Sequence, residues 1–177
     1  MRDSGNSAAK GKSAMKVLHV VGRKNHKKTT LIAELIAHLT QMEVRVGSIK
    51  HCGHEHMLDV PGKDSALHRQ AGAEPTVVLT PSQVAVFQQR LPQNGSYAPI
   101  RAHFEHCDIV LVEGDLNGPG PKIEVWRAEM GGDPIALLRG DIRGIVSNDP
   151  IETDRMVWQR DRIPEIAEAV LELAEAI

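Results

Sequence analysis

Residues 16–39 read KVLHVVGRKNHKKTTLIAELIAHL, and this stretch decides the fold. It begins with an apolar, β-branched run at residues 17–21, which suits a strand buried on both faces of a parallel sheet. After a basic loop, apolar residues recur with helical spacing from Leu31 to Leu39, so we expect an amphipathic helix there. A buried strand, a short loop and such a helix together predict the opening unit of an α/β protein.

Further candidate elements continue this alternation along the chain. Strands are predicted at residues 44–50, 76–80, 84–87, 109–112, 122–126 and 142–147, and helices at residues 64–71, 100–107 and 163–177. We therefore expect an α/β fold of three layers, with a mainly parallel sheet and some antiparallel edge strands. In such sheets ligands bind beyond the carboxyl ends of the strands, so a site is expected in the loops that follow them.

The composition excludes several classes of protein. Of the 177 residues, 41% are apolar, which suits one domain; we expect it to span residues 16–177, after a flexible tail at residues 1–15. No apolar run approaches the ~18 residues that a membrane span requires. A net charge of −2 and an aromatic content of 3% argue against nucleic-acid binding. Two cysteines, Cys52 and Cys107, are too few for a disulfide framework and fit a cytoplasmic protein.

The loop at residues 22–29, GRKNHKKT, is typical of a phosphate-binding loop, G-x-x-x-x-G-K-[ST], except at one position. In such loops backbone N–H groups solvate phosphate oxygens; here Lys28 would reach the terminal phosphates and the Thr29 hydroxyl would ligate Mg²⁺. Lys27 stands where the pattern has glycine, which leaves two interpretations. One is a basic turn without a nucleotide, and the other is a loop that binds polyphosphate but hydrolyses it poorly. The four Lys and Arg side chains of this loop favour the second, because a bound anion would relieve their mutual repulsion.

Five short motifs resemble one family of proteins. They are IKH at residues 49–51, DVPGKDS at 59–65, AGA at 71–73, LVEG at 111–114 and PKIEV at 121–125. In order and spacing they are similar to MobB-type proteins, the P-loop NTPase-like proteins of molybdopterin-guanine dinucleotide biosynthesis. The DVPGKDS motif is the most specific part of this resemblance.

The resemblance implies a protein that binds GTP with Mg²⁺, has weak or lost GTPase activity and forms a homodimer. It also implies an accessory role beside a MobA-type molybdenum cofactor guanylyltransferase, which attaches GMP to molybdopterin. The residues then expected to bind nucleotide or pterin phosphate are Gly22, Asn25, Lys27, Lys28, Thr29, Thr30, Lys50, His51 and Asp149. Those expected near Mg²⁺ are Thr29, Asp59 and Glu113. The sequence identifies no general base for hydrolysis.

Several of these positions have a second interpretation. A carboxylate at Asp149 can accept two hydrogens from the Watson–Crick edge of guanine, but the position is also ordinary turn chemistry, and Asn148 can serve instead. Glu113 can hold a Mg²⁺-bound water, or it can be a strand-end acid that faces solvent. Lys63 and Arg69 can meet the phosphate of a second substrate, or they can form a solvated helix face.

Two other functions stay open. Imidazole and thiol groups are crowded together at His51, Cys52, His54 and His56. This crowding suggests a metal-insertion GTPase, although the spacing matches no standard zinc pattern. The second alternative is a non-hydrolysing binder of pterin phosphate or another polyanion, which Lys27 favours. The candidate strands between residues 76 and 87 would offer an edge for pairing in a dimer.

Overall fold

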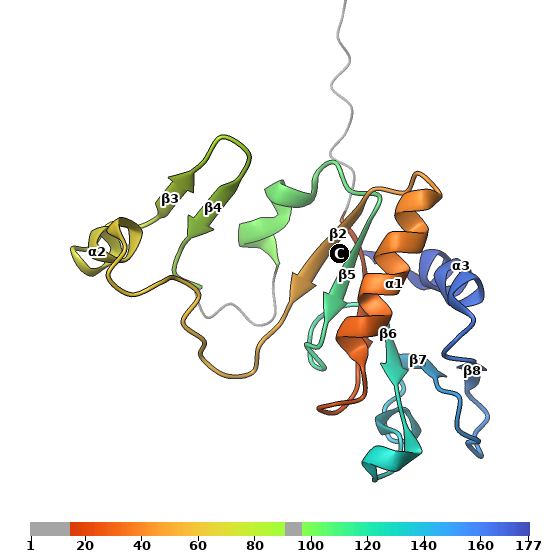
Figure 1. Cartoon of the computed structure of the whole chain (residues 1–177). Coiled ribbons are helices and arrows are strands. Elements are labelled where there is room, and N and C mark those ends of the chain that lie inside the picture. Colours follow the sequence, from red (N-terminus) through yellow and green to blue (C-terminus); the bar gives the residue numbers. More distant parts are fainter. Residues whose placement is uncertain (1–14, 91–96) are drawn as a thin grey trace, which may run out of the picture. The chain divides into compact units, whose positions relative to one another are not determined.

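The computed structural model describes residues 15–90 and 97–177 (Figure 1). The predicted tail lies outside the described residues except for Met15, which is buried. Two compact units make up the chain: a larger unit of residues 1–51 with 95–177, and a smaller unit of residues 52–94. The single domain expected from the sequence stays a prediction. No helix in the described ranges is long and apolar enough to cross a membrane.

The larger unit is built on a mainly parallel sheet with the strand order β2-β5-β1-β6-β7-β8. Neighbours along this order are parallel, whereas β9 pairs antiparallel with the start of β1. The strands are β1 (Lys16–Val21), β2 (Val46–Lys50), β5 (Ile109–Glu113), β6 (Lys122–Val125), β7 (Ile142–Val146), β8 (Met156–Trp158) and β9 (Glu175–Ala176). The prediction of a mainly parallel sheet is thus confirmed, but its antiparallel strand β9 pairs with the central strand β1 instead of forming an edge.

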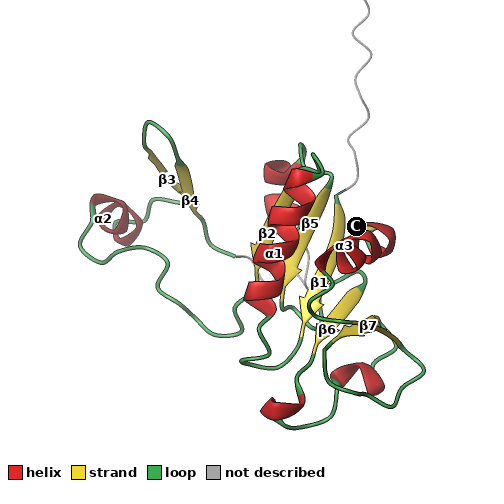
Figure 2. Cartoon of the chain, turned by 45° about the vertical axis from the view of Figure 1, so that its right-hand side comes forward, coloured by secondary structure: helices red, strands yellow, loops and turns green. Residues whose placement is uncertain are grey.

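Two α-helices cover one face of this sheet, α1 (Lys28–Gln41) and α3 (Ile163–Leu173) (Figure 2). Leu18 and Val20 of β1 pack on this face with Leu35 of α1 in one buried cluster. The apolar spacing of α1 that the sequence displays is the reason for this packing, because it places all the large aliphatic side chains on one side of the helix.

Short 3-10 helices and loops cover the opposite face. The 3-10 helices that pack here are η1 (Ala98–Phe104) and η3 (Ile135–Leu137), whereas η2 (Ala128–Met130) follows β6 and has no buried residue. Val17 and Val110 pack here with Tyr97, and Val21 packs with Ala136. Because β1 alternates between the two faces and is buried on both, it is the centre of the core, and the three predicted layers are confirmed.

Two predicted helices differ from the structure, and strand β8 was not predicted. The helix predicted at residues 100–107 is the 3-10 helix η1, which begins and ends earlier. The helix predicted to reach Ile177 ends at Leu173, because the last residues pair with β1 and the Ile177 N–H donates to the Met15 carbonyl at 3.0 Å. Strand β8 was missed because it is short and only half-buried, which leaves no hydrophobic pattern.

The smaller unit contains α2 (Asp64–Gln70) and a two-stranded antiparallel sheet of β3 (Thr76–Leu79) and β4 (Val84–Phe87). All three elements agree with the prediction to within a residue. Four aliphatic side chains share one face of this sheet, since Val77 lies opposite Val86 and Leu79 lies opposite Val84. All four are exposed, Leu79 to 73% and Val84 to 66%. The smaller unit therefore has an apolar face that its described residues, 52–90, leave exposed.

A buried imidazole supports the connection between β5 and β6. This connection, residues 114–121, has no helix, although it joins strands on opposite sides of β1. The side chain of His19, in the middle of β1, is fully buried and faces both parts of the connection: Nε2 lies 2.8 Å from the Pro119 carbonyl and Nδ1 lies 3.2 Å from the Gly114 carbonyl. The neutral ring carries one N–H, so it donates to one of these carbonyl groups at a time. Lys122 donates to the Gly118 and Gly120 carbonyls at 2.8 and 2.9 Å. Polar groups therefore take the place of a covering helix.

We expect the free energy of unfolding to fall as the pH drops from about 7.5 to about 5.5. Burial is the main cause that lowers the pKa of His19 below its usual range. The contacts with the Pro119 and Gly114 carbonyl groups act against it, Lys122 acts in the same direction as burial, and Asp115 acts against it. The unfolded chain therefore binds a proton near pH 6.5 that the folded protein resists, and stability is lost as the pH falls through that range. Urea unfolding at several pH values measures this effect.

The variant His19→Gln should have a lower free energy of unfolding than the wild type. This free energy should, however, fall less than that of the wild type as the pH drops from about 7.5 to about 5.5. The matched control is His103→Gln, which removes an exposed imidazole and should leave the slope of the wild type. An undiminished loss in His19→Gln would show that other groups cause it.

Candidate functional site

The loop between β1 and α1 has a positive φ at three positions, Gly22, Asn25 and Lys27. Gly22 has a φ of 138°, and a Cβ there would lie 2.5 Å from the Val125 carbonyl oxygen of β6. Lys27 has a φ of 64°, in the left-handed region. The loop thus keeps a positive φ where the phosphate-loop pattern has glycine, at a cost of about 1 kcal/mol for a residue with a Cβ. The Lys27 side chain itself is exposed.

A second buried histidine fixes this loop to the segment after β6. His26 is 1% exposed, and its Nδ1 accepts a hydrogen bond from the Arg127 backbone N–H at 3.1 Å. The Arg127 guanidinium in turn donates to the Asn25 carbonyl at 3.4 Å. Burial, helped by the neighbouring cations, lowers the pKa of His26 and favours the neutral ring that can accept this bond. Sequence reasoning missed His26 and Arg127, since only the fold brings residues this far apart together.

Three of the predicted site residues meet at the start of α1. Thr29 Oγ1 donates to Glu113 Oε1 at 2.7 Å, and Lys50 Nζ lies 3.4 Å from the same oxygen. They come from α1, β5 and β2, whose register places Lys50 directly beside Glu113. The carboxyl ends of adjacent parallel strands therefore bring a hydroxyl and a carboxylate together, which is the kind of oxygen donor set that Mg²⁺ prefers.

The Lys28 side chain lies across its own loop. Its Nζ donates to the Arg23 carbonyl at 2.8 Å. Burial lowers the pKa of Lys28, Glu113 raises it and Lys50 lowers it further. An anion bound in the loop would be a stronger partner than a carbonyl and would raise that pKa.

Two cavities adjoin this loop. The first, about 660 Å³, is lined by Lys24, Asn25, Lys27, Lys28, Thr29, Thr30, Glu113, Arg127, Glu129 and Met130. The second, about 520 Å³, lies at the ends of β6 and β7 and is lined by His26, Lys27, Thr30, Glu34, Val125, Trp126, Arg127, Glu129, Asn148, Asp149, Arg160 and Asp161. We call them the loop cavity and the β7 cavity. They share four lining residues, so the two cavities adjoin each other over the loop.

The structure brings Asp149 and Asn148 to the β7 cavity. The Asp149 carboxylate accepts a hydrogen bond from the Ala128 N–H at 2.7 Å, and its own N–H donates to the Ser147 hydroxyl at 3.0 Å. The Asn148 side-chain carbonyl accepts the Arg160 N–H at 2.7 Å. Both side chains hold neighbouring loops in place, as the interpretation of these residues as turn residues implies. Their position at the β7 cavity also suits a role in ligand binding.

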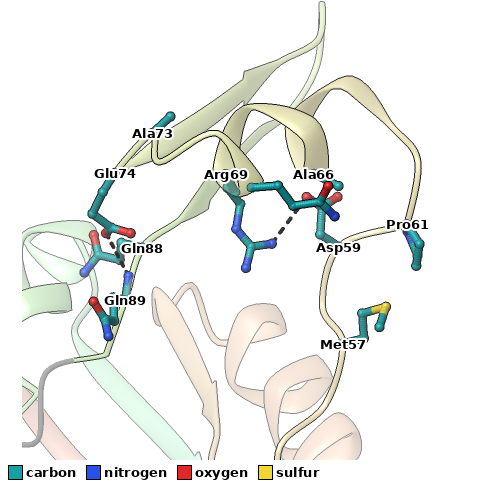
Figure 3. A pocket seen from close by; sticks show the side chains of 10 residues that line it. Met57, Asp59, Pro61, Ala66, Arg69, Ala73, Glu74, Gln88 and Gln89 are labelled. Carbon is teal, nitrogen blue, oxygen red and sulfur yellow. Dashed lines mark hydrogen bonds and ion pairs between the residues drawn. The ribbon is translucent and has the colours of Figure 1, made fainter.

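Asp59 organises the smaller unit. Its carboxylate accepts hydrogen bonds from the Ser65 hydroxyl at 3.0 Å and from the Val60 N–H at 2.9 Å, and it lies 3.4 Å from the Arg69 guanidinium (Figure 3). The guanidinium also lies over the ring of Phe87, 5.3 Å from its centroid. The DVPGKDS motif therefore builds the start of α2 through Asp59. A role of Asp59 near Mg²⁺ stays a prediction, as Thr29 and Glu113 belong to the other unit.

The histidine-rich loop forms no metal centre in the structure. His51 closes the larger unit, where its N–H donates to the Glu113 carbonyl at 3.0 Å. Cys52, His54 and His56 belong to the smaller unit and are exposed. Within residues 15–90 and 97–177, no three His, Cys, Asp or Glu side chains are grouped so that they could hold a metal ion. The histidine and cysteine side chains that are close together in the sequence are therefore not grouped as metal ligands in the described residues.

Together these features define an α/β protein of the P-loop-like class, with its candidate site where a buried parallel strand leads into a basic loop. The family model for molybdopterin guanine dinucleotide synthesis protein B, MobB, matches residues 17–148. The chain belongs to this family.

Relatives and solved structures agree with this assignment. The molybdopterin-guanine dinucleotide biosynthesis adapter protein of Haemophilus influenzae is 32% identical over 156 residues, which cover 87% of this chain and 86% of that protein. The Escherichia coli protein with the same description is 28% identical over 166 residues, with coverages of 92% and 95%. The crystal structure of Bacillus subtilis MobB has the same fold, with a TM-score of 0.70 at 23% identity, over 91% of this chain and 99% of that one.

The variant Gly22→Ala should lower the free energy of unfolding by about 2 kcal/mol or more. The new methyl group would meet the Val125 carbonyl, and the positive φ would be strained as well. The control is Gly140→Ala, where a Cβ has no neighbour within 4 Å, and the change should stay within about 0.5 kcal/mol. Urea unfolding of both variants measures the difference. Equal losses would contradict the close approach of the loop to β6.

Proposed function

We propose that this protein is an adapter in molybdopterin guanine dinucleotide biosynthesis that binds GTP with Mg²⁺ and presents it to a partner guanylyltransferase of the MobA type. The adapter role follows the descriptions of the relatives from Haemophilus influenzae and Escherichia coli. The observation that carries GTP binding is the convergence of Lys28, Thr29 and Glu113 at one end of the loop cavity. Helix α1 begins at this point, so its free N–H groups add to the attraction for phosphate.

The loop supports anion binding in spite of Lys27. Glycine matters in phosphate-binding loops because its backbone can adopt a positive φ and leave room for phosphate. Lys27 has the positive φ, and its exposed side chain adds a cation at the rim of the loop cavity. Compared with glycine, Lys27 therefore adds a charged side chain to the loop but leaves the backbone conformation of the loop unchanged.

The Mg²⁺ ion would be held by the Thr29 hydroxyl and, through water, by the Glu113 carboxylate. These two groups already lie 2.7 Å apart, so the ion would replace their mutual hydrogen bond without moving α1 or β5. The ion would supply charge neutralisation for the terminal phosphates. Hydrolysis is expected to be weak or absent, in keeping with the lack of an identified base.

The base would lie in the β7 cavity, beside Asp149 and Asn148. A carboxylate there can accept hydrogen bonds from two neighbouring donors of guanine, whereas adenine presents only one donor on that edge. The bond to the Ala128 N–H orients the Asp149 carboxylate at the cavity. This arrangement favours GTP over ATP.

Calorimetric titration of the full chain with GTP, GDP and ATP, each with and without Mg²⁺, tests the proposal. We expect Mg²⁺-dependent binding that prefers guanine, and a loss of about 10–100-fold in GTP affinity for Lys28→Ala, since one charged hydrogen bond to phosphate is removed. The matched variant Lys27→Gly restores the glycine of the pattern without changing the sign of φ and should keep GTP affinity within a few-fold. A protein that binds no nucleotide contradicts the proposal. Binding of a pterin phosphate in its place would support the polyanion alternative.

We also propose that the protein is a homodimer in which the smaller unit packs against a second copy. The exposed face of Val77, Leu79, Val84 and Val86 carries this proposal. Isolated two-stranded sheets are only marginally stable in water, so a second apolar surface on this face would contribute to their stability.

Replacement of one aliphatic side chain by a charge tests the dimer. Leu79→Lys should convert a dimer into a monomer, because burial of an unpaired charge in the interface is costly. Leu138→Lys is the control, since Leu138 is 87% exposed and belongs to the larger unit. Sedimentation equilibrium measures the mass of each. A monomeric wild type, or a dimer that survives Leu79→Lys, would contradict this face as the interface.

A further inference from the structure

Arg127 lies where the loop cavity and the β7 cavity meet. Four residues line both cavities: Lys27, Thr30, Arg127 and Glu129. Lys28 lines only the loop cavity, and Asp149 lines only the β7 cavity. A ligand that extends from Lys28 to Asp149 must therefore pass the four shared residues.

Of the two cations among them, Arg127 is the one that is held in place. Its backbone N–H is bound by the buried His26, and its guanidinium donates to the Asn25 carbonyl and pairs with Glu129. Arg127 thus attaches the segment after β6 to the loop at two points, His26 and Asn25, although the segment and the loop lie far apart in the sequence. Lys27 has an exposed side chain and a strained backbone, so it offers charge without a fixed direction.

The partners of Arg127 leave its guanidinium available to a ligand. The side chain of Arg127 is 31% exposed and that of Glu129 is 62% exposed, so their ion pair is solvated and weak. The bond to the Asn25 carbonyl is long, at 3.4 Å. A phosphate diester or ester oxygen, which matches the planar fork of arginine, would be a stronger partner than either.

We propose that Arg127 binds the nucleoside monophosphate part of the guanine nucleotide, at the α-phosphate, while Lys28 binds the terminal phosphates. This inference rests on the proposed GTP binding. It assigns to the loop after β6 a binding role that the phosphate-loop pattern does not contain. It also gives His26 a function, because His26 positions the backbone of Arg127 at the junction of the cavities.

Titration of the full chain with GMP, GDP and GTP in the presence of Mg²⁺ tests the assignment. Arg127→Gln should weaken all three by a similar factor of about 10-fold or more, because each contains the α-phosphate. Lys28→Ala should weaken GTP and GDP much more than GMP. Arg127→Lys, which keeps the charge but loses the fork, should recover part of the affinity. Arg143→Gln, which lines neither cavity, is the control and should bind like the wild type.

The results separate the inference from the proposed function. If Lys28→Ala behaves as expected but Arg127→Gln binds like the wild type, the inference is wrong and GTP binding stands. If Arg127→Gln weakens GTP and GDP but not GMP, Arg127 contacts the terminal phosphates and the inference is also wrong. If the wild type binds no guanine nucleotide, both are overturned. The bond from the Arg127 backbone to His26 does not depend on the side chain, so the thermal unfolding of Arg127→Gln should match that of the wild type.

Discussion

Strand β1 pairs with β5 on one side and with β6 on the other, and its side chains are buried on both faces of the sheet. The rest of the larger unit depends on this placement. The loop after β1 must leave the sheet between two neighbouring strands, which is why Gly22 lies against the Val125 carbonyl and why no larger residue fits. The same placement brings Thr29 to Glu113 and His26 to Arg127. The candidate site therefore follows from one strand being in the centre.

This central position also has a cost, which is seen on the face opposite α1. The chain must cross β1 between β5 and β6, and residues 114–121 do so without a helix. Their carbonyl groups would be left without partners if apolar side chains lay beneath them, and such groups are costly to bury. His19 and Lys122 provide the missing donors, and Asp141 lies 3.0 Å from the buried Lys122 ammonium. The burial of His19 in β1 and of Lys122 in β6 is thus explained by the topology.

The sequence predicted the sheet class, most strands and the three residues that meet at the start of α1, because strand burial and helix amphipathicity are local patterns. It also identified the smaller unit's elements, where turn residues separate short apolar runs. It could not predict the 3-10 form of η1, nor the short strands β8 and β9, since such short segments carry no hydrophobic pattern and depend on contacts with distant residues. The same limit applies to the site. His26 and Arg127 are 101 residues apart in the chain, and no spacing rule connects a loop histidine to the residue after a later strand.

The departure at Lys27 has a physical explanation that links the fold to the site. A left-handed residue with a side chain is strained by about 1 kcal/mol, and a further cation in a basic loop adds repulsion. Both effects are small compared with the packing of β1 and the attachment of the loop through His26, so the loop keeps its backbone. Its charge, by contrast, changes the balance between ligands. The exposed Lys27 side chain lines the loop cavity together with Lys28, so it adds a second cation beside the first. A loop with both lysines attracts an anion more strongly than a loop with glycine at residue 27 would.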